Sequence, residues 1–288
     1  MISINLLHPV SSFLYFVSIL CITMFTNNPF ILLISFFGGV IFLLCQKCYF
    51  SKGEILGFII MSILITATNP LFVHRGETVL FFFNNNPVTA ESLFFGANLS
   101  LMLISTIMWF KSLNLVLTDD KILAIFGKLS PKFATIISLV LRFIPMLKRQ
   151  AKKIKDAQIV AGLYKTDTFV DKIKSTVRVY SSLLTYCFEN AITIGNSMKS
   201  RGYGSKKIKY FNFYSWKISD TIFIVSLIII DILIAFMSCG GYIKFSFYPV
   251  IKYESTVIPY ILFLCLSLYP SIIEIKESLK WKYYIQKI

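Results

Sequence analysis

Six apolar runs in this sequence have a length close to that of a membrane-spanning helix. Such a helix needs about 20 mostly apolar residues, because the hydrocarbon core of a bilayer is roughly 30 Å thick. A water-soluble domain rarely has this much apolar sequence, and the mean hydropathy of the whole chain is +0.71. We therefore predict an all-α integral membrane protein with about six transmembrane helices. The runs are residues 10–25, 30–45, 56–73, 93–117, 222–237 and 257–273.

The first two runs are joined by Thr26-Asn27-Asn28-Pro29, a turn-forming cluster that predicts a tight hairpin between two short spans. The alternative for the first run is a cleaved signal peptide. Residues 1–9 lack the Lys or Arg that precedes the apolar core of a signal peptide. We therefore expect the first run to remain as a span.

Basic residues are distributed very unevenly along the chain. Of the 29 Lys and Arg residues, 19 lie between residues 118 and 217. If the N-terminus is inside the cell, 25 fall on the inner side, Lys111 falls within a span, and only Arg75, Lys244 and Lys252 fall outside. Short cytoplasmic loops carry the excess of Lys and Arg in membrane proteins. We therefore predict a multi-pass protein of the cell membrane with both termini in the cytoplasm.

The charge pattern also divides the chain into three predicted parts. Residues 1–117 form an N-terminal membrane domain of four spans, and residues 219–288 form two further spans and a basic tail. Residues 118–218 form a helical cytoplasmic domain inserted between the fourth and fifth spans. Its positive charge suits nucleic acid, anionic lipid headgroups or an acidic protein surface, and charge alone does not choose among them.

The first long helix of the cytoplasmic domain is expected over residues 132–162. Ser130-Pro131 precedes it, which suits an N-cap followed by proline at the first helical position. Residues 133–147 are apolar except for Arg142, and Pro145 is expected to bend the helix. This run is short for a span. We therefore expect it at the membrane interface or packed in a helix bundle, with Arg142 facing phosphate, a carboxylate or backbone carbonyls.

The second long helix has apolar residues at alternating intervals of four and three. This pattern predicts lengthwise packing against another helix at a shallow angle. We call this set the predicted seam, and it consists of Ile173, Val177, Tyr180, Leu184, Cys187, Ala191, Ile194 and Met198.

The predicted seam ends at Ser200-Arg201-Gly202-Tyr203-Gly204. The two glycines stop the helix and leave Arg201 projecting from its last turn. Such an arginine either docks into a partner or satisfies the last carbonyls and the negative end of its own helix.

The two cytoplasmic helices resemble the signatures of the energy-coupling factor (ECF) transporter T component, the EcfT/CbiQ family. The first stretch of resemblance contains Arg142 and Pro145, followed by Asp156, Gln158 and Gly162. The second runs from Ala191 through Met198 to Ser200-Arg201-Gly202. The order of spans and cytoplasmic helices is also similar, so the resemblance covers most of the chain.

The resemblance implies a non-catalytic scaffold subunit of a micronutrient importer. Its partners would be two ABC-type ATPase subunits, a substrate-binding membrane S component and the lipid bilayer, with no nucleic acid. Each of two coupling helices in this family ends in an Ala-Arg-Gly-like motif whose arginine docks into one ATPase. Here the second motif is Ser200-Arg201-Gly202, whereas the first is Val160-Ala161-Gly162 and lacks the arginine. The resemblance therefore implies a weaker first contact, or a substitute cation such as Lys155 or Lys165.

The sequence lacks the groups that an energy-converting or catalytic subunit needs. It has no GxxxxGK[ST] phosphate loop, and its two histidines, His8 and His74, have no plausible catalytic partner. Cys45 and Cys48 form a single CxxC without a second pair, which is a poor zinc site. We expect no cofactor bound by this chain and ATP bound by its partners. The transported substrate, a vitamin or a metal ion, cannot be read from these residues.

Asp231 lies near the middle of the fifth predicted span. An ionisable side chain at this depth is costly and is usually paired or functional. We expect it to pair with polar groups of neighbouring spans or to contact the substrate-binding subunit. Two other functions remain open: a self-sufficient secondary transporter of a small solute and a membrane-embedded enzyme.

Overall fold

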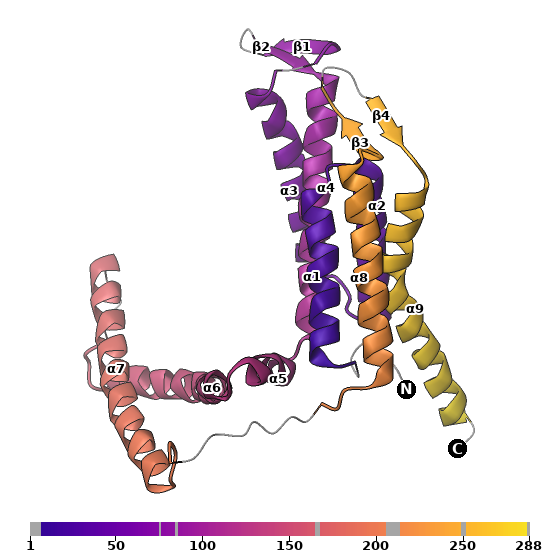
Figure 1. The fold of residues 1–288 in the computed structure, drawn as a ribbon. Helices are drawn as coiled ribbons and strands as arrows, with labels where there is room; N and C mark the ends of the chain where they lie inside the picture. Colours follow the sequence, from indigo (N-terminus) through magenta and orange to yellow (C-terminus); the bar gives the residue numbers. More distant parts are fainter. Residues whose placement is uncertain are drawn as a thin grey trace. The chain divides into compact units, whose positions relative to one another are not determined.

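The computed structural model describes residues 7–74, 76–83, 86–164, 168–205, 214–248 and 252–286. The chain forms two compact units (Figure 1). The first, which we call the membrane unit, contains Met1–Thr118 and Tyr214–Ile288; the second, which we call the inserted unit, is Asp119–Phe213. The helices of the membrane unit are α1 (Pro9–Phe25), α2 (Pro29–Cys45), α3 (Lys52–Phe72), α4 (Ala90–Val116), α8 (Ile218–Cys239) and α9 (Ile258–Gln286).

The predicted all-α membrane fold is confirmed. Among the described residues, α3, α4, α8 and residues 258–276 of α9 are long and apolar enough to cross a bilayer. The helices α1 and α2 are apolar but have 17 residues each, which is the lower limit of a span. They are short because the turn before Pro29 ends one helix and begins the next.

Asn28 fixes this turn. Its side-chain oxygen accepts a hydrogen bond from the backbone N–H of Phe30 at 3.0 Å and so caps α2. Its side-chain amide donates to the hydroxyl of Tyr260 at 2.8 Å and to the carbonyl of Ile243 at 3.3 Å. The turn predicted from the sequence therefore also ties α2 to α9 and to the segment that follows α8.

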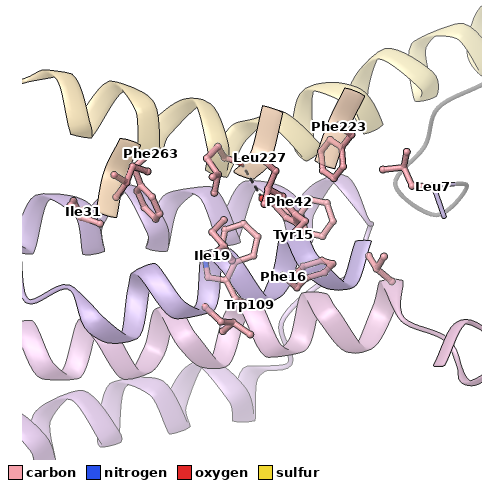
Figure 2. Packing of buried hydrophobic residues seen from close by; sticks show 14 of the residues in the cluster. Leu7, Tyr15, Phe16, Ile19, Ile31, Phe42, Trp109, Phe223, Leu227 and Phe263 are labelled. Carbon is pink, nitrogen blue, oxygen red and sulfur yellow. Dashed lines mark hydrogen bonds between the residues drawn. The ribbon is translucent and has the colours of Figure 1, made fainter. Parts of the chain in front are cut away.

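The core of the membrane unit is built around Trp109 of α4, which is fully buried. Its ring stacks on Phe42 of α2 at a centroid distance of 6.2 Å and meets Phe16 of α1 edge-on at 6.3 Å. Its indole N–H donates to the hydroxyl of Ser35 at 2.9 Å. Figure 2 shows Tyr15, Phe16 and Trp109 gathered between the helices. One aromatic centre therefore holds α1, α2 and α4 together.

Two glycines let helices of this unit approach closely. A Cβ at Gly96 of α4 would lie 3.0 Å from the backbone Cα of Thr66 in α3. A Cβ at Gly38 of α2 would lie 2.9 Å from the Cβ of Ser267 in α9. In a bilayer, such close contacts replace the hydrophobic effect as the source of helix association.

Two antiparallel hairpins in the membrane unit were not predicted. One pairs β1 (Val79–Phe83) with β2 (Asn86–Thr89), and the other pairs β3 (Ile243–Ser246) with β4 (Lys252–Ser255). Both lie at the same end of the helix bundle (Figure 1). They lie in the connections that follow α3 and α8.

The inserted unit contains α5 (Asp119–Leu129), α6 (Pro131–Val160) and α7 (Phe169–Ser200). The start of α6 at Pro131 agrees with the prediction, although the side chain of Ser130 makes no capping hydrogen bond. The helix continues through Pro145 to Val160. The short helix α5 packs on α6 and was not predicted.

Within the described part of the chain, the predicted seam of α7 is not packed lengthwise against another helix. Ile173, Val177, Tyr180 and Leu184 are each at least half exposed, whereas the buried residues of α7 are Ser175 and Val179. Figure 1 shows α7 crossing α6 rather than lying along it. A crossing helix buries a short patch, so most of the seam has no partner within the described part of the chain.

Candidate functional site

The end of α7 is a Schellman cap, with Arg201 as the capping residue. The N–H of Gly202 donates to the carbonyl of Lys199 at 2.9 Å, and the N–H of Tyr203 donates to the carbonyl of Met198 at 3.0 Å. Gly202 has a φ of +79°, which a residue with a Cβ rarely adopts. Backbone N–H groups thus satisfy these helix-end carbonyls. The exposed side chain of Arg201 is not needed to cap the helix.

The end of α6 has the same cap. The N–H of Gly162 donates to the carbonyl of Ile159 at 3.0 Å, and the N–H of Leu163 donates to the carbonyl of Gln158 at 2.9 Å. Gly162 has a φ of +69°. The capping residue is Ala161, which is exposed.

The two motifs therefore occupy equivalent positions in one backbone structure. The capping residues have nearly the same dihedral angles, with φ −74° and ψ 1° at Ala161 and φ −82° and ψ 8° at Arg201. Val160-Ala161-Gly162 aligns with Ser200-Arg201-Gly202, residue for residue. The two helix ends differ in the side chain that they present, a methyl group in one and a guanidinium in the other.

Two of the signature residues occupy matching places in these caps. Gln158 and Met198 each supply the carbonyl three residues before the capping residue, which accepts the Schellman hydrogen bond that spans more residues, from the N–H five residues later. The side chain of Gln158 is buried and that of Met198 is half-buried. The other signature residues, Arg142, Pro145 and Asp156, are exposed along α6.

A cation does lie beside the first cap, but it comes from the other helix. Arg178 of α7 donates from Nη1 to the carbonyl of Leu163 at 3.0 Å. Lys155, one of the suggested substitutes, lies over the ring of Tyr164 at 5.1 Å, and Lys165 falls outside the described residues. No sequence pattern indicated Arg178, because the crossing of α6 and α7 brings it there.

The unit also exposes two apolar stripes. The α7 stripe consists of residues that are each at least 50% exposed: Phe169, Ile173, Val177, Tyr180, Leu184, Phe188 and Ile192. The α6 stripe consists of residues between 44% and 62% exposed: Phe133, Ile136, Val140 and Ile144. The spacing of three and four places each set along one side of its helix. Contiguous apolar surface of this extent indicates a protein or membrane contact.

In the membrane unit, Asp231 of α8 lines a cavity shared with α1. The hydroxyl of Ser18 faces its carboxyl group. Oδ1 of Asp231 is buried and has no hydrogen-bond partner among the described residues. The expected pairing with neighbouring spans is therefore incomplete.

The cysteines, all six within the described part of the chain, are free thiols.

The family model described as CbiQ, cobalt transport protein, matches residues 3–211 of this chain, a segment that contains α1 to α7 and both caps. The chain belongs to the CbiQ family. The resemblance seen in the sequence is thereby confirmed.

Curated relatives of this CbiQ-family chain carry the name energy-coupling factor transporter transmembrane protein EcfT. The Listeria innocua protein is 30% identical over 195 residues, which is 64% of this chain and 73% of the relative. The Streptococcus equi subsp. equi protein is 28% identical over 244 residues, which is 80% of this chain and 90% of the relative. The chain is thus a multi-pass membrane protein of a transporter family.

Proposed function

We propose that this CbiQ-family chain is the coupling subunit of an ECF-type importer. It transmits ATP-driven motion from two cytoplasmic ATPase subunits to a separate membrane subunit that captures a micronutrient, a vitamin or a metal ion. The observation that carries this proposal is the exposed arginine at a capped helix end. The side chain of Arg201 takes no part in the cap of α7, so its guanidinium can bind another protein.

The chemistry of this side chain suits a groove on an ATPase. A guanidinium carries five N–H donors in a fixed plane and remains charged at any physiological pH. It binds carboxylates and backbone carbonyls with charge-assisted hydrogen bonds, each contributing about 1.5–3 kcal/mol. At the first cap, Arg178 supplies the nearby guanidinium in place of an arginine at position 161.

The proposed motion uses α6 and α7 as levers. Each ATPase holds one helix end, and ATP binding and hydrolysis in the two ATPases change the separation of these ends. The uncovered α7 stripe gives the membrane subunit an apolar surface through which the motion reaches it. This chain then needs no nucleotide of its own.

The test is substitution of Arg201 in the chain co-expressed with the ATPase subunits. Arg201→Ala and Arg201→Glu should lower the recovery of ATPase with the purified chain by about tenfold or more. ATP-driven uptake should fall in parallel, while the amount of chain in the membrane stays unchanged. The matched control is Lys199→Ala, which removes an exposed charge two residues earlier on the same helix.

Two results would contradict the proposal. The first is unchanged recovery of ATPase with both Arg201 variants. The second is substrate transport by the purified chain alone in liposomes, which would indicate the self-sufficient carrier instead.

A further inference from the structure

The N-terminal half of α6 has an uncovered apolar side, the α6 stripe. Its four side chains are between 44% and 62% exposed. Ser138 is also exposed, but it precedes Val140 of the stripe by two residues and therefore lies about 200° away around the helix. This half of α6 is thus amphipathic, with the stripe on one side and a polar side chain on the other.

A cluster of five cations follows the stripe along α6. We call it the α6 basic cluster, and it consists of Lys148, Arg149, Lys152, Lys153 and Lys155. All five side chains are exposed, and none pairs with a carboxylate in the described part of the chain. Lys148 and Lys155 lie on the side of the stripe, because they follow Ile144 by four and by eleven residues. Along one side of α6, apolar surface therefore gives way to positive charge.

The combination of these two features favours one of the three occupants that charge alone left open. Nucleic acid offers phosphates, but no apolar layer for the exposed side chains of the stripe. An acidic protein would have to present carboxylates and an apolar patch in matching positions. The surface of an anionic bilayer presents charged headgroups beside acyl chains everywhere. Residues 121–155 match such a surface in charge, because they include nine basic residues and no acidic residue.

The bilayer is also close to α6 along the chain. The helix α4 is long and apolar enough to cross a membrane. It ends at Val116, and α5, which packs on α6, begins at Asp119. The polypeptide that enters the inserted unit therefore starts at the membrane surface.

We propose that α6 binds the anionic phospholipid surface of the bilayer, with the α6 stripe among the acyl chains and the α6 basic cluster on the headgroup phosphates. A basic amphipathic helix of this kind lies in the plane of the membrane, with its apolar side about 5–10 Å deep. Its lysines reach the headgroups with their long side chains. The first cap, at Ala161, is about 40 Å along the helix from Phe133, so it extends beyond the anchored half. The inference needs only this chain and lipid and does not depend on the coupling function.

The test uses the purified full-length chain in lipid nanodiscs, with its six native cysteines replaced by alanine. An environment-sensitive fluorophore is attached at Val140→Cys, on the stripe, or at Ser138→Cys, the control on the opposite side of α6. The discs contain phosphatidylcholine alone or an equimolar mixture with phosphatidylglycerol. In the anionic discs, emission from position 140 should shift to the blue and be quenched by a nitroxide on the lipid acyl chain. Position 138 should respond much less, and neutral discs should weaken the response at position 140.

Substitution of the cations tests the electrostatic part. One triple variant removes charge from the α6 basic cluster: Lys148→Gln, Lys152→Gln and Lys153→Gln. The matched control removes the same charge from exposed positions of α7: Lys172→Gln, Lys174→Gln and Lys199→Gln. The first variant should lower the equilibrium constant for docking about fivefold for each charge removed, and added salt should act in the same direction. The control should leave the emission from position 140 unchanged.

Three results would overturn the inference. The first is equal emission from positions 138 and 140 in anionic discs. The second is an equal response of position 140 to the two triple variants. The third is emission from position 140 that shifts only after an ATPase or the substrate-capturing subunit is added, which would make the stripe a protein contact.

Discussion

Positions 161 and 201 occupy the same place in two identical helix caps but carry different side chains. Restoring the missing arginine tests whether this difference weakens one ATPase contact. Ala161→Arg should tighten ATPase binding about tenfold or more, because it adds charge-assisted hydrogen bonds. The measurement is titration of the purified chain with the ATPase subunit. Ala157→Arg, which adds the same charge one turn earlier on an exposed position of α6, is the control and should have little effect.

A substitution of Arg178 extends this test to the other guanidinium near the first cap. If its guanidinium serves the first contact, Arg178→Ala should weaken ATPase binding in the unaltered chain and should have much less effect beside Ala161→Arg. Non-additivity of this kind is what two groups that serve one contact produce. Equal effects in both backgrounds would show that Arg178 only holds the carbonyl of Leu163.

At the scale of elements, the cap of α7 has to keep its shape for Arg201 to project. Gly202 has a φ of +79°, so Gly202→Ala should destabilise the cap by about 1–2 kcal/mol. We expect a lower recovery of ATPase even though Arg201 is retained. Gly195→Ala is the matched control: this glycine lies inside α7 with nothing within 4 Å of the added Cβ, so ATPase recovery should be unchanged. Normal recovery with Gly202→Ala would show that the cap geometry is unimportant.

The contact between α3 and α4 depends on a glycine in the same way. In Gly96→Ala the new Cβ meets the Thr66 backbone at 3.0–3.1 Å, and a backbone cannot move aside as a side chain can. Overpacking of this kind costs about 1–3 kcal/mol, so the melting temperature of the chain in detergent should fall. Gly57→Ala in α3 adds the same methyl group in open space and should leave the melting temperature unchanged or raise it. A similar result for both variants would contradict the close approach.

The sequence predicted those elements whose signal is local. Bilayer thickness sets the length of a span, and Pro131, Gly162 and Gly202 mark helix ends through their own backbone preferences. The predicted seam is not covered lengthwise within the described chain, because a periodic pattern shows that a helix has an apolar face and not what covers that face. Arg178 was missed for a related reason: its place beside the first cap depends on how α7 crosses α6. The hairpins were missed because short strands within connections leave a weak signal.

At the scale of the whole molecule, the membrane unit has two distinct ends. Its helices α1, α2, α3, α4, α8 and α9 alternate in direction, and both hairpins lie at one end of the bundle (Figure 1). The C-terminal end of α4 and the N-terminal end of α8, which lead to the inserted unit, lie at the opposite end of the bundle. Most of the basic residues lie in the stretch of chain that joins α4 to α8, within residues 118–217.

This arrangement predicts which end faces the cytoplasm. The loop between α2 and α3 contains exposed Tyr49 and should lie inside, whereas β1 contains exposed Leu80 and should lie outside. The measurement is labelling of intact cells with a membrane-impermeant maleimide, using Tyr49→Cys and Leu80→Cys in a chain whose six native cysteines are replaced by alanine. We expect labelling at position 80 alone in intact cells and at both positions after lysis. The reverse pattern would place residues 118–217 outside the cell, where neither ATP-driven partners nor a coupling role for Arg201 is possible.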